Sequence, residues 1–132
     1  MSGLDLSRRP IHLGLKATAV VEPDFTGDPR WYQAYGERHA ADGAEGRLVS
    51  VFSFDAPWTS WEMHPHGSEV VLCIAGTITL HQERADGSRH TVTLEVGQYA
   101  INEPGTWHTA DVDREATAVF VTAGLGTTHR PR

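Results

Sequence analysis

The sequence predicts an all-β protein, a sandwich or barrel of antiparallel strands with one short helix near its N-terminus. Eight short strand-like runs alternate with turns from residue 47 onward, and most of them alternate apolar and polar side chains. Only one stretch of the chain carries a convincing helical pattern. With 132 residues, the chain has the length of a single domain and is too short for a second one with its own core.

The N-terminal part of the chain contains the expected helix. Residues 1–16 show little periodicity, so we expect them to form an N-terminal extension and the single domain to span residues 17–132. We expect the helix over Arg30 to Ala41, where apolar side chains recur at the spacing of one helix face. Asp28 provides an N-cap and Pro29 a first-turn proline.

The remainder of the domain is expected to be strands and turns. The expected strands cover residues 17–22, 47–55, 59–66, 69–75, 77–83, 90–95, 98–102, 107–112 and 116–123. Asp86-Gly87 lies between two of these runs and indicates a hairpin, because this pair accepts the positive φ angles of tight turns. The run Val70 to Ala75 is apolar on both faces, so its second face needs a cover. Either the N-terminal segment with its helix or another subunit would supply that cover, and we expect a homodimer through this sheet.

Composition excludes several classes of partner. The chain has 11 Lys and Arg against 17 Asp and Glu, a net charge of −6, with no dense basic cluster, so we expect no nucleic-acid partner. No run approaches the ~18 apolar residues that a membrane span needs. Cys73 is the only cysteine, which excludes an intrachain disulfide and favours a buried structural thiol. We therefore expect a cytoplasmic protein that binds neither membrane nor nucleic acid.

One short segment holds most of the potential metal ligands. Glu62, His64, His66 and Glu69 lie within eight residues. On a strand, the first three of these would point to the same face, because side chains alternate with period two. Imidazole nitrogen and carboxylate oxygen suit iron, manganese, nickel, copper or zinc. Without further context, alternating His and Glu on a strand more often indicate a solvated outer face.

Further spacings give that context. The intervals from Glu69 to Gly76, from Gly97 to Gly105 and from Gly105 to His108 resemble the two motifs of the cupin superfamily, in the same order. The chain looks like a small single-domain metal-binding cupin of the cupin 2 type, with the resemblance covering about residues 47–123. It implies a double-stranded β-helix, or jelly-roll barrel, with one divalent transition metal (Fe, Mn, Ni, Cu or Zn) bound between its sheets.

The sequence departs from the family pattern at several positions. Pro104 sits one place later than the family proline, whose position holds Glu103, and Val112 stands where the second motif ends in asparagine. The leading glycine of the first motif is absent. The departure that bears on the ligands is the short gap between His66 and Glu69, with two residues where the family has three or four.

This short gap leaves two ligand sets open. If His64-Pro65-His66 is the family His-x-His, the ligands are His64, His66, Glu69 and His108. If the family spacing back from Glu69 is kept, His64 takes the second histidine position and Glu62 the first. We slightly favour the second set, because it leaves a turn of normal length. His64, Glu69 and His108 belong to both.

The resemblance implies a metal-dependent enzyme acting on a small organic molecule, with dioxygenase-type or isomerase/cyclase-type chemistry. Glu69, or Glu62 if it stays uncoordinated, would be the catalytic proton carrier. The alternatives are a non-catalytic module that senses or stores a small molecule or metal, and a structural barrel without metal. Four aromatic residues are candidates for a pocket wall: Trp58, Trp61, Tyr99 and Trp107. The other histidines are not expected at the site: His12, His39, His81, His90 and His129.

Overall fold

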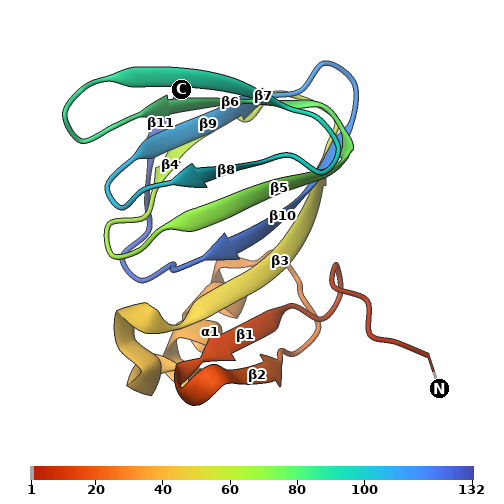
Figure 1. Ribbon diagram of the computed structural model, residues 1–132. Helices are drawn as coiled ribbons and strands as arrows, with labels where there is room; N and C mark the ends of the chain where they lie inside the picture. The colour runs from red at the N-terminus through yellow and green to blue at the C-terminus, as the bar shows by residue number, and fades with distance from the viewer. Residues whose placement is uncertain (1) are drawn as a thin grey trace.

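The computed structural model describes residues 2–132 (Figure 1). In chain order its elements are β1 (Ile11–Gly14), η1 (Leu15–Ala17), β2 (Thr18–Val21), α1 (Pro29–Arg38), η2 (Ala40–Glu45), β3 (Arg47–Phe54), β4 (Ser60–Met63), β5 (Glu69–Gly76), β6 (Ile78–Glu83), β7 (Arg89–Leu94), β8 (Tyr99–Asn102), β9 (Trp107–Asp111), β10 (Ala116–Thr122) and β11 (Thr128–Pro131). Among these elements, no helix is long and apolar enough to cross a lipid bilayer.

The strands form two antiparallel sheets that face each other (Figure 1). The larger sheet has the order β2-β1-β3-β10-β5-β8, and the smaller one has the order β11-β4-β9-β6-β7. The predicted all-β jelly roll is thereby confirmed, with one refinement. Within residues 2–132 no strand pairing joins the two sheets, so they form an open double layer rather than a continuous barrel.

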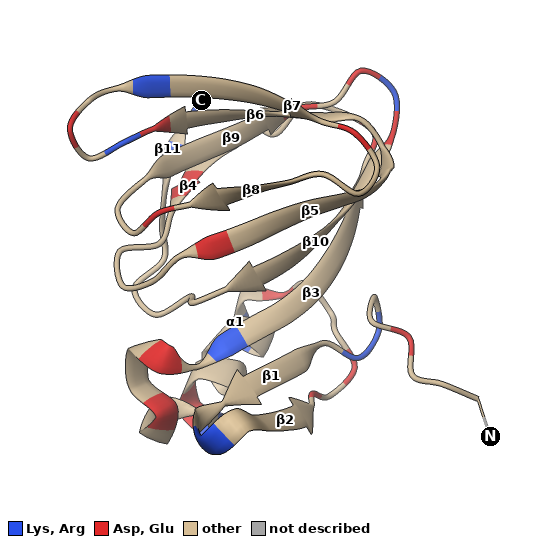
Figure 2. Cartoon of the chain, viewed as in Figure 1, with Lys and Arg blue, Asp and Glu red and all other residues tan. Residues whose placement is uncertain are grey.

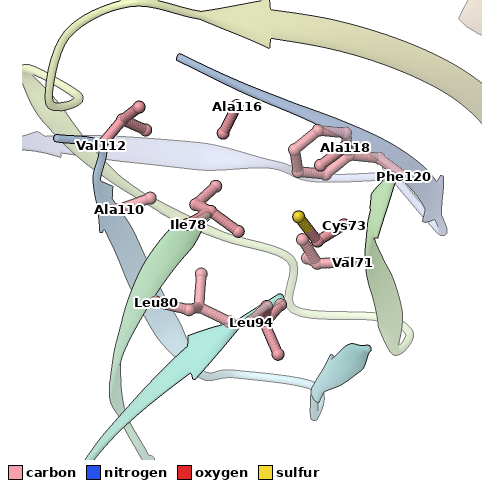
Figure 3. Packing of buried hydrophobic residues seen from close by; sticks show 10 residues of the cluster. All are labelled: Val71, Cys73, Ile78, Leu80, Leu94, Ala110, Val112, Ala116, Ala118 and Phe120. Carbon is pink, nitrogen blue, oxygen red and sulfur yellow. The ribbon is translucent and has the colours of Figure 1, made fainter. Parts of the chain in front are cut away.

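The core lies between the sheets and follows from the alternation of the strands. In β5 and β6 every second side chain is buried, which places Val71 and Cys73 opposite Ile78 and Leu80. Figure 3 shows these residues with Phe120 of β10 converging on the same interior. Each fully buried aliphatic or aromatic side chain contributes roughly 1.5–3 kcal/mol relative to exposure. This packing fixes the positions of the strands that carry the candidate ligands.

Gly76, at the end of β5, shows why the motif needs a glycine there. Its φ is +68°, a left-handed conformation that side chains rarely adopt. A Cβ at this position would also lie 2.0 Å from the carbonyl oxygen of Glu115, which precedes β10. The turn that joins β5 to β6 is therefore open only to glycine. The predicted hairpin between β6 and β7 is also present, with Gly87 at φ +85°.

The N-terminal segment differs from the expectation in two respects. Residues 11–14, expected to precede the ordered domain, form β1 and pair with both β2 and β3. The run is too short to show periodicity, and its pairing partners lie elsewhere in the chain. The helix begins as predicted, with Asp28 accepting a 2.8 Å hydrogen bond from the Arg30 N–H, but it ends at Arg38. The chain then continues as the 3-10 segment η2.

The outer face of the larger sheet is apolar across all six strands. One cross-strand row runs through Val21, Ile11, Val49, Val121, Val70 and Ile101. Ile74 is 44% exposed and Tyr99 is 64% exposed on the same face. The sequence predicted a cover for this face, but Trp31 of the helix packs through Phe25 against Phe52, which lies on the core side of β3.

Candidate metal site

Four of the predicted ligands meet in the interior between the sheets. Glu62 lies on β4, His64 directly follows that strand, Glu69 begins β5 and His108 lies on β9. Each offers one ligand atom, and these atoms all lie within 4.8 Å of one another. Each carboxylate is the only charged residue of its strand. Figure 2 shows them as isolated red segments on β4 and at the start of β5. The strand pairing that sets Glu62 opposite His108 accounts for their approach.

The two imidazoles face the two carboxylates through their Nε2 atoms. His64 Nε2 lies 2.9 Å from Glu62 Oε1 and 3.1 Å from Glu69 Oε2. His108 Nε2 lies 3.1 Å from Glu69 Oε1 and 3.6 Å from Glu62 Oε1. His64, Glu69 and His108 are at most 4% exposed, whereas the Glu62 side chain is 29% exposed. Glu62 is therefore the group of the cluster that meets solvent.

Hydrogen bonds at the far nitrogen fix the tautomer of each histidine. His108 Nδ1 lies 3.5 Å from the Thr106 carbonyl oxygen, which only accepts hydrogen bonds. His64 Nδ1 lies 2.7 Å from Thr127 Oγ1, whose own hydrogen is donated to the Gly124 carbonyl at 2.8 Å. Both Nδ1 atoms must then be donors. In a neutral imidazole this leaves the Nε2 lone pair directed into the cluster.

Glu69 is held by donors on both neighbouring strands. Thr122 and Asn102 are its direct cross-strand partners on β10 and β8. The Thr122 hydroxyl donates to Oε2 at 2.6 Å, and the Asn102 amide donates to Oε1 at 3.0 Å. Gln82 on the opposite sheet donates to the Asn102 side-chain oxygen at 2.8 Å, which orients the Asn102 amide toward Glu69. The carboxylate is therefore fixed in place before any metal binds.

The electrostatics of the cluster favour its charged forms. Burial is the largest single influence on each pKa and favours the neutral group, but contacts between opposite charges outweigh it. The pKa of His64 and that of His108 rise to about 9, and the pKa of Glu69 falls to about 2. The pKa of Glu62 falls well below its ordinary value. Near neutral pH the metal-free cluster therefore holds two imidazolium ions and two carboxylates.

The donor set fits a divalent transition metal. His108 Nε2 is buried and makes no hydrogen bond within residues 2–132, although Glu69 Oε1 lies 3.1 Å away. With both imidazoles neutral, their lone pairs and the two carboxylates converge on one point, an arrangement that a divalent cation would stabilise. Two nitrogen and two oxygen donors without sulfur suit Fe, Mn, Ni, Cu or Zn. A divalent ion replacing two protons would leave the charge of the cluster unchanged.

His66 lies outside this cluster. The alternation of β4 ends at Met63, and residues 65–67 form a bend, so His66 does not share the face of Glu62 and is exposed. The structure thus brings together Glu62, His64, Glu69 and His108. This is the ligand set obtained when the family spacing back from Glu69 is kept. Metal binding by any of these residues stays a prediction.

Sequence reasoning missed the contribution of the C-terminal segment. Thr127 contacts His64, and His129 Nε2 lies 2.9 Å from Glu62 Oε2. Both residues follow the region of the family motifs, and β11 is too short and polar to be predicted as a strand. Thr122 also contacts the cluster through Glu69. Its sequence position gives no signal, because a polar residue at the end of a strand is common.

Of the four aromatic candidates for a pocket wall, only Trp58 packs near the cluster. Its ring lies 6.0 Å from that of His108 and packs with Phe54 and Phe120. Trp61 and Trp107 lie under the Arg130 guanidinium instead. Tyr99 stands exposed on the outer face of the larger sheet.

A second group of titratable residues ties the N-terminal segment to the larger sheet. His12 of β1 contacts Asp42 Oδ2 and the Tyr35 hydroxyl, each at 2.6 Å. The His12 ring stacks on His39 at 3.6 Å, and His39 contacts both oxygens of the buried Glu22 at 3.0 Å. His12, His39 and Asp42 lie close enough to share a metal, but the stacked rings direct their nitrogens along nearly parallel planes. Their hydrogen bonds indicate that this group anchors the N-terminal segment to the larger sheet.

Comparisons with known proteins agree with this architecture. No protein-family model matches the sequence, and no curated protein matches it. An uncharacterised protein with a double-stranded β-helix domain from Klebsiella pneumoniae is 24% identical, over 65% of this chain and 76% of that one, with a TM-score of 0.54. An oxalate oxidase is 13% identical, over 62% of this chain and 45% of that one, with a TM-score of 0.54.

A hydroquinone 1,2-dioxygenase, solved with Cd²⁺ and 4-hydroxybenzonitrile, is 13% identical, over 58% of this chain and 56% of that one, with a TM-score of 0.51. These likenesses establish the class of the protein: its chain has the cupin fold, a double-stranded β-helix. The chain spans about half the length of the two enzymes that it matches.

Proposed function

We propose that this chain is a metal-dependent enzyme of the cupin fold that acts on a small organic molecule by dioxygenase-type or isomerase/cyclase-type chemistry. The observation that carries the proposal is the convergence of His64, Glu69, His108 and Glu62 on one point inside the fold. Four protein donors leave open positions on an ion that prefers six, and a substrate would occupy them. A cytoplasmic location stays a prediction from the sequence.

In this proposal the residues of the cluster have two roles, metal binding and proton transfer. When bound, the ion supplies Lewis acidity and, in the case of iron or manganese, redox chemistry with dioxygen. His64, His108 and Glu69 would hold it together with Glu62, because hydrogen bonds from outside the cluster orient the first three side chains. Glu62 is the more exposed carboxylate of the cluster, so it is the one placed to exchange a proton with the substrate.

Two structural neighbours support the choice of substrate class. One was solved with a metal ion and a hydroxylated aromatic nitrile, and the other is an oxalate oxidase. Trp58 packs beside His108 in this chain, and Phe54 and Phe120 pack against Trp58. An aromatic surface beside a metal suits a small planar substrate that carries oxygen donors.

A binding module without catalysis is the second candidate, and a specific observation favours it. Two surface hollows among the described residues lie away from the cluster, one lined by Asp55, Gly76 and Arg114 and the other by Val92, Leu94 and Tyr99. Neither reaches a cluster residue. A tetrahedral ion held by all four donors would have a filled coordination sphere, as structural zinc sites do.

We also propose a homodimer, in which a second copy covers the outer face of the larger sheet. The proposal is supported by the six-residue apolar row and by the exposure of Ile74 and Tyr99 beside it.

Reconstitution with defined metals tests the catalytic proposal. Chelator-treated protein is loaded with Fe²⁺, Mn²⁺, Ni²⁺, Cu²⁺ or Zn²⁺ and offered hydroquinones, oxalate and enolisable sugars. Oxygen uptake and anaerobic proton NMR then report oxidation and isomerisation. We expect turnover with at least one metal, and its loss in His108→Ala but not in His90→Ala, an exposed histidine on β7. Tight ligand binding with no turnover under any metal would favour the binding module.

A further inference from the structure

The C-terminal strand β11 forms the edge of the smaller sheet beside the candidate metal site. It pairs with β4 so that His129 lies opposite Glu62, which in turn lies opposite His108. Cross-strand partners in an antiparallel pair share a face of the sheet, so these three side chains form one row on the inner face. The strand thus extends the row of candidate ligands beyond the motif region.

The direction of His129 is set by its neighbours on β11. Arg130 points to the opposite face, where its guanidinium lies 4.5 Å from the Trp107 ring centroid and 5.2 Å from that of Trp61. It also donates to Glu83 Oε2 at 2.7 Å. Arg132 contacts Asp111 at 2.5 Å. Since strand side chains alternate, anchoring Arg130 and Arg132 on the outer face directs His129 to the face of Glu62, at the rim of the cluster, where its side chain is 57% exposed.

The two carboxylates of the cluster differ in their outer contacts. Glu69 receives hydrogen bonds from both Thr122 and Asn102. Outside the cluster, the only side chain of the described residues that contacts the Glu62 carboxylate is His129, at 2.9 Å from Oε2. Glu62 is also the more exposed carboxylate, so without this contact only the two imidazoles of the cluster would hold its side chain.

We propose that His129 is a positioning residue that orients Glu62 for metal binding, so that β11 completes the site. This inference rests on the proposed metal-dependent function. The His129 Nε2–H holds Glu62 Oε2, which leaves Oε1 directed at the two imidazoles. Partners in this outer position typically change metal affinity 10–100-fold when they are removed.

Titration of chelator-treated protein with Co²⁺ tests the inference. Calorimetry gives the affinity, and visible absorption gives the coordination of the ion independently of any activity. We expect His129→Ala to bind Co²⁺ about 10–100-fold more weakly and with an altered spectrum. We expect His129→Gln, whose amide can donate to Glu62, to recover part of the affinity. The exposed His90→Ala is the matched control and should bind as the wild type does.

A double-mutant cycle separates positioning from a general structural effect. If His129 acts through Glu62, the variant His129→Ala/Glu62→Gln loses no more affinity than Glu62→Gln alone. Additive losses would overturn the inference, as would wild-type Co²⁺ affinity in His129→Ala. If the wild-type protein itself binds no Co²⁺, the proposed function fails and this inference fails with it.

Discussion

Raising the pH of the metal-free protein removes the protons that hold the cluster together. The pKa of His64 and that of His108 rise from 6.5 to about 9 on folding. A group with a raised pKa stabilises the fold fully below its unfolded value, and this stability is lost as the pH rises through the folded value. The loss therefore falls between pH 6.5 and 9. Above it, two imidazole lone pairs face two carboxylates.

The size of this loss follows from the pKa change. Each pKa unit corresponds to about 1.4 kcal/mol, so one histidine accounts for about 3 kcal/mol. Both histidines are buried, so solvent screening is small. They share the same carboxylates, so the second loss does not add in full, and we expect at least about 3 kcal/mol in total. Glu69 affects stability at acidic pH instead. Because its pKa is lowered on folding, the stability that it contributes is lost as the pH falls from 4.5 toward about 2.

Urea unfolding followed by tryptophan fluorescence, in the presence of a chelator, measures the effect between pH 6 and 9. With a denaturant slope of ~2 kcal/mol per molar, the midpoint should fall by at least about 1.5 M over this range. His108→Gln should flatten this dependence, whereas His90→Gln should leave it unchanged. A wild-type midpoint that does not move between pH 6 and 9, or equal slopes in wild type and His108→Gln, would refute the reasoning.

Three further predictions concern the fold, the cluster and the assembly. Gly76→Ala should destabilise the protein by at least about 3 kcal/mol in thermal unfolding, because the added Cβ meets the Glu115 carbonyl. Gly87→Ala is the control: the space around Gly87 is open, so this variant should lose far less stability. Thr122→Val removes a donor to buried Glu69 and should cost about 1.5–3 kcal/mol in urea unfolding at pH 6; a neutral result would contradict the role given to Thr122. Leu72→Glu, on the outer face of the larger sheet, should shift a wild-type dimer to monomer in sedimentation velocity, and a monomeric wild type would disprove the dimer.

Much of the fold could be predicted because its signal is local. The apolar run that follows Glu69 and the turn at Asp86-Gly87 depend only on neighbouring residues, and the predicted strand and hairpin are both present. Gly76 could be singled out by spacing, and its φ and close approach to Glu115 explain the requirement. β1 and β11 escaped prediction because each is a four-residue strand with no longer pattern around it, so its partners rather than its own sequence stabilise it.

The candidate ligands could be predicted from the sequence, but the residues that hydrogen-bond to them could not. Period-two alternation places Glu62 and His64 on one face, but it also includes His66, which the bend after Met63 removes. The end of a strand cannot be read from alternation alone. Thr122 and His129 reach the cluster only through strand pairing with Glu69 and Glu62. Contacts of this kind, between residues more than fifty positions apart, have no signal in a single sequence.

The central claim, that the cluster exchanges two protons for one divalent metal ion, is tested most directly by calorimetric titration of chelator-treated protein with Zn²⁺ at pH 7.5. Running the titration in buffers of different ionisation enthalpy gives the number of protons released. We predict one ion per chain and about two protons released per ion, because both imidazoles have a pKa of about 9 before the metal binds. No binding, or binding that releases no protons and persists in His108→Ala, would contradict the account.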